Sequence, residues 1–122
     1  MRITVVGKLP SFHEYMNGID GKKDEQEKLK QQIEDKLLWG IKQSNVRGTD
    51  EPVILKINWY EKDRTRDANN VVFAKKFIIE ALVKSNVLNG KTRRYIKGFQ
   101  DELFVDSTDP RIEIELIEQN KY

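Results

Sequence analysis

Residues 62–94 hold most of the side chains in this sequence that could carry chemistry. Asp67 stands just before a strongly apolar helical pattern, and Lys76 and Glu80 follow within it. If these groups converge, the carboxylates could hold a divalent cation and the lysine could contact a phosphate, as phosphodiester hydrolysis requires. The simpler interpretation is that Asp67 only caps the helix and Lys76 only faces solvent. Local spacing alone favours that simpler interpretation.

The same stretch lies in the most basic part of the chain. Residues 61–100 contain ten basic and four acidic residues, whereas the whole chain has 22 basic and 20 acidic residues and a net charge of +2. A local excess of positive charge favours a polyanionic partner. An ordinary solvated surface accounts for charge counts of this size equally well, so the counts leave both interpretations open.

Composition excludes several other kinds of site. The chain has 122 residues, enough for one domain with one core. It has no cysteine, which excludes disulfides and thiolate chemistry, and its one histidine disfavours a zinc site. Any metal would be a hard cation on oxygen ligands. No apolar run reaches the roughly 20 residues that span a bilayer, and no signal peptide is recognisable, so we expect a cytoplasmic protein without a membrane partner.

Hydrophobic periodicity predicts the elements that position these residues. Apolar residues three and four apart predict helices, and alternating apolar residues predict strands. The predicted helices are 22–43 and 70–85, and the predicted strands are 2–7, 53–60, 93–99, 103–105 and 111–118. We expect Trp39 to pack into the core beside the apolar stripe of the first helix. Asp67 and Asn69 are both candidate N-caps of the second helix.

The order of these elements predicts an α+β fold. Strand, helix, strand, helix and then further strands suit a two-layer sandwich, in which a mixed sheet of about four strands carries both helices on one face. Residues 1–122 are then a single domain. The second helix is apolar nearly all round, which predicts either deep burial or contact with another subunit.

Several short motifs stand in a defined order along the chain. They are Leu9-Pro10-Ser11 with Tyr15, Asp67-Ala68-Asn69-Asn70, Lys76, Glu80-Ala81-Leu82 and Leu88-Asn89-Gly90. In this order they resemble the RusA-type Holliday junction resolvases, which are crossover-junction endodeoxyribonucleases. That family has an Asp-x-Asp-Asn motif before a helix, then a lysine and Asp-Ala-Leu, then an acidic turn and an alternating strand. The resemblance covers most of the chain.

The resemblance implies a homodimer that binds four-way DNA junctions and cuts them with Mg²⁺, or with Mn²⁺ in its place, and with no organic cofactor. It implies that Asp67, Asn69 and Lys76 are catalytic, and that Asp67, Asn69 and Glu80 are metal ligands. The residues expected to contact DNA are Arg64, Arg66, Lys75, Lys91, Arg93 and Arg94.

The sequence departs from the family pattern at its acidic positions. The second aspartate is replaced by Asn69, and the aspartate pair of the turn by Asn89-Gly90. These changes would remove about two negative charges from the metal site and weaken the binding of a hard divalent ion. We therefore expect impaired endonuclease chemistry with DNA binding retained. Cleavage would survive only with replacement ligands, for which the candidates are Glu61, Asp63, Asp101 and Glu102.

Two other functions fit the same fold. A protein-interaction module without a nucleic-acid role would use the acidic face of the first helix and the apolar second helix. An RNA-binding sandwich would need a stacking platform of exposed aromatic side chains. We expect no such platform, because the strands lack paired exposed aromatics and Trp59 and Tyr60 face opposite sides.

Overall fold

The computed structural model describes residues 2–7, 9, 23–63 and 68–119, with Lys23 and residues 68–70 described for the backbone alone. The elements are β1 (Arg2–Val6), α2 (Lys23–Ser44), β2 (Val53–Glu61), α3 (Ala68–Lys84), β3 (Ile96–Val105) and β4 (Arg111–Glu118). They follow the predicted order of strands and helices.

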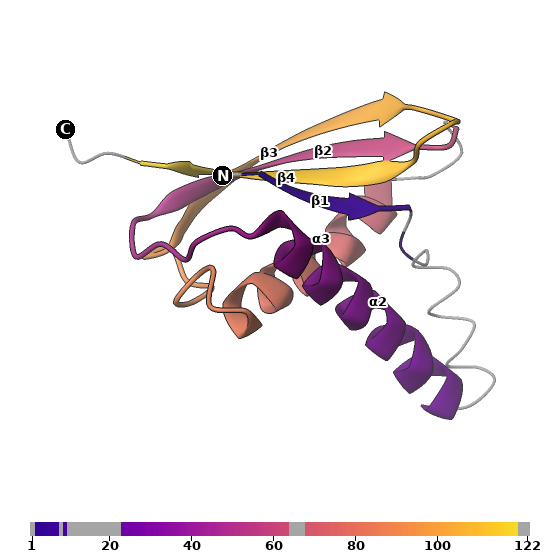
Figure 1. Cartoon of the computed structure of the whole chain (residues 1–122), viewed down its shortest axis with the longest axis horizontal. Coiled ribbons are helices and arrows are strands. Elements are labelled where there is room, and N and C mark those ends of the chain that lie inside the picture. The colour runs from indigo at the N-terminus through magenta and orange to yellow at the C-terminus, as the bar shows by residue number, and fades with distance from the viewer. Residues whose placement is uncertain (1, 8, 10–22, 64–67, 120–122) are drawn as a thin grey trace.

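The strands form one mixed sheet in the order β1-β4-β2-β3. β4 pairs antiparallel with both β1 and β2, whereas β2 and β3 are parallel. Both helices lie against one side of this sheet, which we call the helix side, and no described helix covers the opposite, outer side (Figure 1). The predicted α+β fold, with a four-stranded mixed sheet and two helices, is confirmed.

The core lies between the sheet and the helices because apolar side chains alternate along the central strands. The odd-numbered residues of β2 from Val53 to Trp59 and the even-numbered residues of β4 from Ile112 to Leu116 are buried, while their neighbours face the outer side. The apolar stripe of α2 closes the same layer at helical spacing. The buried residues of these three elements are Val53, Leu55, Ile57, Trp59, Ile112, Ile114, Leu116, Ile33, Leu37 and Ile41.

The apolar character of α3 is largely explained by burial within the chain. Phe77, Ile78 and Leu82 are buried, and the rings of Phe73 and Phe77 meet edge to face with centroids 5.0 Å apart. Val71, Phe73, Ile79 and Val83 are partly buried against the same core. Val72 alone among its large apolar residues is mostly exposed, at 69%. Deep burial, the first of the two predicted alternatives, therefore accounts for most of this helix.

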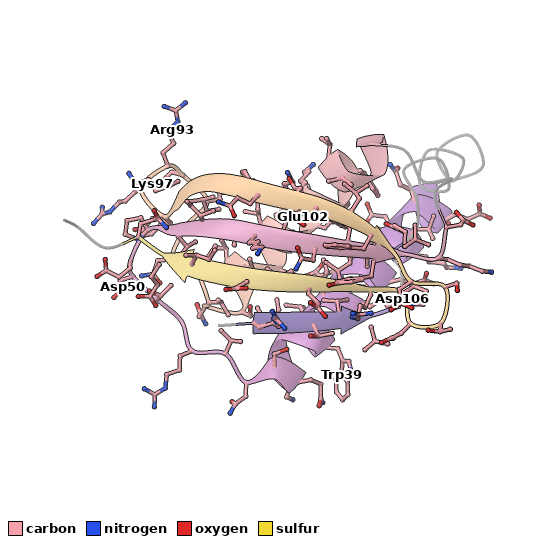
Figure 2. The ribbon with its side chains drawn as sticks, turned by 90° about the horizontal axis from the view of Figure 1, so that it is seen from above. Trp39, Asp50, Arg93, Lys97, Glu102 and Asp106 are labelled. Atoms are coloured by element: carbon pink, nitrogen blue, oxygen red, sulfur yellow. The ribbon has the colours of Figure 1, made fainter. Side chains whose placement is uncertain are left out.

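The prediction that Trp39 packs into the core is wrong. Its side chain is 62% exposed and projects beyond the edge of the sheet (Figure 2). Trp39 is two residues from the buried Leu37, and two residues turn an α-helix by about 200°. The indole therefore lies on the side of α2 away from the core.

The two strand pieces predicted near the C-terminus are one continuous strand. β3 runs from Ile96 to Val105 and pairs with β2 over most of that length. The polar run Gln100-Asp101-Glu102 does not interrupt it, because β3 is an edge strand on which polar side chains keep access to water. Arg93 and Arg94, which were predicted inside a strand, lie in the turn before it.

Candidate functional site

Four of the predicted site residues line one hollow beside α3. The hollow has a volume of about 350 Å³ and is lined by Val72, Lys75, Lys76, Ile79, Glu80 and Lys91. Five of these residues recur at three- and four-residue spacing, so they share one face of α3. Val72 and Ile79 give the hollow apolar surface between lysine side chains, an arrangement that suits an anion carrying an apolar body.

Lys91 reaches this hollow because the chain turns back after α3. The N–H groups of Val87 and Leu88 both donate to the carbonyl of Leu82, at 2.9 and 3.2 Å, and close the end of the helix. The amide of Asn89 donates to the carboxylate of Asp50, which holds the turn against the loop before β2. These contacts fix the segment that carries Lys91 and the cations after it.

Packing against a tyrosine ring explains why position 90, in the turn after α3, is a glycine. A Cβ atom placed on Gly90 would lie 2.7 Å from Cε2 of Tyr95, so any larger residue requires the ring to move. Tyr95 lies in the turn before β3, where its carbonyl accepts from Val53 at 2.8 Å. The family's aspartate at this place therefore does not fit the present packing.

Lys75 lines the hollow with its charge already balanced. Its ammonium donates to Oδ2 of Asp101 at 2.6 Å, and Oδ1 of Asp101 accepts from the Trp59 indole at 3.0 Å. The Lys75 ammonium also lies 4.5 Å from the centre of the Phe99 ring. This contact joins α3 to β2 and β3, and it makes Lys75 a weaker phosphate contact than was predicted from charge alone.

The remaining cations form what we call the basic surface: Lys76, Lys91, Arg93, Arg94 and Lys97. None of them has an ion pair with a residue that the structure describes. Arg93 and Lys97 project at one end of the sheet (Figure 2). The guanidinium of Arg94 lies 5.6 Å from the Tyr95 ring, which orients it.

Lys84, in the last turn of α3, does not add to the basic surface. Its ammonium forms an ion pair with Glu34 of α2, and the hydrogen bond and charge of that carboxylate raise the pKa of Lys84. Residues 81–100 contain no acidic side chain. The cations at 91, 93, 94 and 97 are therefore not offset by acidic residues in their own segment, whereas Lys76 has Glu80 beside it in the hollow.

Of the three predicted metal ligands, the structure describes the side chain of Glu80. Glu80 lines a hollow that Lys76 and Lys91 also line, and the positive charge of these two lysines opposes a divalent cation. Among the residues whose placement is described, no three carboxylate or histidine side chains gather to hold a metal. Asp67 lies outside the described residues, as do Arg64 and Arg66, and Asn69 is described for the backbone alone.

Two of the four proposed replacement ligands, Asp101 and Glu102, do not converge. Asp101 is engaged by Lys75 and Trp59 on the helix side. Glu102, its neighbour on β3, faces the outer side of the sheet because successive side chains of a strand alternate. These two carboxylates therefore point to opposite faces and cannot share one ion.

An aromatic pair that the sequence did not predict lies on the outer side. The rings of Tyr60 and Phe104 stack with centroids 4.8 Å apart, and the guanidinium of Arg111 lies 3.8 Å from the centre of the Tyr60 ring. These residues are cross-strand neighbours on β3, β2 and β4. The sequence did not predict this cross-strand pair, because the pairing depends on strand register, and of its two members Phe104 is exposed while Tyr60 is partly buried. The stacked ring faces are, however, turned toward one another rather than toward an incoming base.

Comparison with known proteins adds no family assignment. No protein-family model matches the sequence, and no curated protein matches it. Among the described helices, none is both long and apolar enough to cross a membrane.

Proposed function

We propose that this protein binds DNA, with a preference for four-way junctions, through the basic surface. The observation that carries the proposal is the placement of Lys76 and Lys91 at one hollow, continued by Arg93, Arg94 and Lys97 in the turn and strand that follow. A row of cations, of which those in residues 81–100 have no acidic neighbour in that segment, favours a phosphate backbone over a single small anion. Junction preference rests on the resemblance to RusA-type resolvases, which also motivates a homodimeric, cytoplasmic protein.

The proposal does not include a metal-dependent cleavage step. Glu80 shares its hollow with lysines and Asp101 is paired with Lys75, and among the described residues no three carboxylate or histidine side chains gather to hold a metal. DNA binding through ammonium and guanidinium groups needs no metal, because these groups contact phosphate oxygens directly. The protein would then hold branched DNA, with strand cutting impaired.

The test is binding of a synthetic four-way junction compared with a linear duplex of the same sequence, each with and without Mg²⁺ or Mn²⁺. We expect junction-selective binding and no symmetric nicking. The affinity should fall with salt along a log–log slope of about −0.9 for each phosphate contacted. Salt-independent binding, or equal affinity for junction and duplex, would contradict the proposal. Symmetric nicking would show that cleavage is retained and would contradict the impairment.

Paired charge reversals localise the contact. Arg93→Glu with Arg94→Glu should weaken DNA binding at least about tenfold and flatten the salt dependence. The matched control is Lys28→Glu with Lys30→Glu, which changes the net charge equally on exposed positions of α2. Equal losses in the two double variants would indicate a net-charge effect and would remove the basic surface from the proposal.

The second candidate function is a protein-interaction module on the same fold. The observation that favours it lies on β3, where several large apolar side chains are exposed together. Absence of junction binding at low salt would favour this function over DNA binding.

A further inference from the structure

β3 leaves the sheet with an open apolar edge. It is the outermost strand beside β2, and no described strand pairs with its other edge. Phe99, Leu103 and Val105 are exposed by 42%, 57% and 52%, and Phe104 is partly exposed as well. A long, apolar edge strand with free backbone N–H and C=O groups is a ready template for pairing with another chain.

The two sides of this edge differ in chemistry. Asp101 and Phe99 contact Lys75 of α3, so they lie on the helix side, and alternation places Leu103 and Val105 there too. This side presents apolar groups, and its one charge is balanced by Lys75. Phe104 stacks on Tyr60 on the outer side, so Glu102 also lies on that outer side.

Glu102 gives the outer side a charge without a partner. No described basic residue pairs with its carboxylate, and its cross-strand neighbour on β2 is Asn58. The Oδ1 atom of Asn58 is buried and accepts no hydrogen bond from the described residues. A positively charged donor on an added strand would lie opposite Glu102 and complement its charge.

The first part of β3 carries a bulge and a lysine that discourage strand addition. The pairing register with β2 shifts between Val53 and Ile54, which leaves Lys97 as an extra residue on the edge strand. A bulge and a lysine are both devices that discourage pairing. Residues 99–105 have neither, so this stretch is the open part of the edge.

We propose that residues 99–105 of β3 bind an extended segment of another protein, which adds to the sheet as a fifth strand. Its apolar side chains would alternate on the helix side against Phe99, Leu103 and Val105, and a lysine or arginine on its other side would face Glu102. Backbone hydrogen bonds would supply affinity, and the side chains would supply specificity. This site is separate from the proposed DNA contact and does not depend on it.

A second copy of this chain complements the edge less well. Antiparallel pairing that sets Phe99 opposite Leu103 also sets Asp101 opposite its own copy. A shift that sets Phe99 opposite Val105 sets Glu102 opposite its own copy. Like charges directly opposite on neighbouring strands are destabilising. A strand with a basic residue at the corresponding position avoids this repulsion and adds an attraction.

The test uses the full chain and a short fluorescent peptide in which valine alternates with threonine and one lysine replaces the central threonine. We expect binding by fluorescence anisotropy, with slower hydrogen exchange at residues 99–105. The same peptide N-methylated at all of its central amides should not bind, because neither of its backbone edges can then donate N–H hydrogen bonds or approach β3 closely. Equal binding of the two peptides would overturn strand addition.

Variants of the edge test its position. Leu103→Lys, which adds a charge to the helix side of the edge, should weaken the peptide at least about tenfold. The control is Val6→Lys on β1, a site that is 69% exposed on the other edge strand, and it should leave peptide binding unchanged. Equal weakening by both variants would overturn the assignment to β3. Dimerisation of the protein alone that Leu103→Lys abolishes would identify a second copy as the occupant instead.

Charge exchange tests the specificity. Glu102→Lys should reverse the preference, so that a peptide with glutamate at the central position binds up to about fivefold better than the lysine peptide, which corresponds to about 1 kcal/mol for a cross-strand ion pair. An unchanged preference for lysine would show that Glu102 does not face the added strand.

Discussion

The two edge strands of the sheet differ in how far the rest of the domain covers them. β1 has five residues, and α2 packs closely against it. The N–H of Thr4 donates to Oγ of Ser44 at 3.2 Å, which satisfies an amide that another chain could use. β3 has ten residues and carries exposed apolar side chains along its second half.

The difference follows from which residues the helices place against the sheet. α2 brings Gly40 so near β1 that an added Cβ would lie 3.0 Å from the carbonyl of Thr4. α3 instead presents large side chains such as Phe77 and Ile78 to the core, and these hold its backbone away from the strands. A helix with small residues can therefore cover an edge, and a helix with large ones supports a sheet without closing its edge.

The largest effect on stability should come from adding a side chain at Gly40, where α2 lies closest to β1. Gly40→Val places atoms where Val5 Cγ2 and the Thr4 carbonyl already lie, at 2.9 and 3.0 Å from the new Cβ. We expect the free energy of unfolding to fall by about 2 kcal/mol, measured by urea denaturation. Gly98→Val on β3 is the matched change, because nothing lies within 4 Å of its Cβ position. We expect it to shift stability by less than about 0.5 kcal/mol. Similar losses in both variants would refute the contrast between the edges.

Removing the carboxylate that joins β3 to α3 should be next in size. Asp101→Ala leaves the Lys75 ammonium and the Trp59 indole N–H without their common acceptor, in a region where the two ion-pair side chains are 19% and 23% exposed. We expect a loss of about 1–2 kcal/mol in the free energy of unfolding. Asp101→Asn keeps an oxygen for the indole, so it should cost less. Thermal or urea unfolding of both variants would show the order, and an equal or reversed order would argue against the shared-acceptor role.

Removing the hydrogen bond between the Thr4 N–H and Ser44 Oγ should have a smaller effect on stability. It should also change amide hydrogen exchange locally, at β1. Ser44→Ala removes the acceptor of the Thr4 amide and should cost about 1 kcal/mol, with faster hydrogen exchange at Thr4. Ser85→Ala is the control, because Oγ of Ser85 donates to Ala81 O as Oγ of Ser44 donates to Gly40 O. Unchanged exchange at Thr4 in Ser44→Ala would show that the serine does not close this edge.

The smallest expected effect concerns the end of β3 and depends on pH. Hydrogen bonds from Arg111 and Thr108 lower the pKa of Asp106 below its ordinary value of 3.8. A lowered folded-state pKa gives stability that is present above the unfolded value and is lost as pH falls through the folded one. Acid should therefore destabilise the native protein below about pH 4, and Asp106→Asn should show a shallower acid limb in unfolding experiments. Superimposable pH profiles would remove Asp106 from this role.

Much of the fold could be predicted because the periodicity of the chain is strong. The alternation in β2 and β4 and the stripe of α2 depend only on which residues follow one another. Trp39 was misplaced because its apolar character outweighed its angular position on the helix. β3 was divided because polar residues in its middle look like a break when the neighbouring strand is unknown.

The candidate site was less predictable because its electrostatics depend on long-range contacts. Lys75 and Lys76 look equivalent in the sequence. Asp101, which is 26 residues from Lys75, nevertheless forms an ion pair with Lys75 and not with Lys76. The Tyr60–Phe104 stack likewise needs the register between two strands that are far apart in the chain. Local spacing carries no information about such pairs.

The sequence by itself determined the α+β class, the burial pattern of the central strands and the concentration of basic residues before and within β3. It could do so because periodicity and local charge are properties of adjacent residues. Only the tertiary structure decided which cations remain unpaired, which way each carboxylate faces and which edge of the sheet stays open. Those outcomes depend on strand order and on how closely each helix approaches the sheet, and both are set by side chains that meet only when the chain is folded.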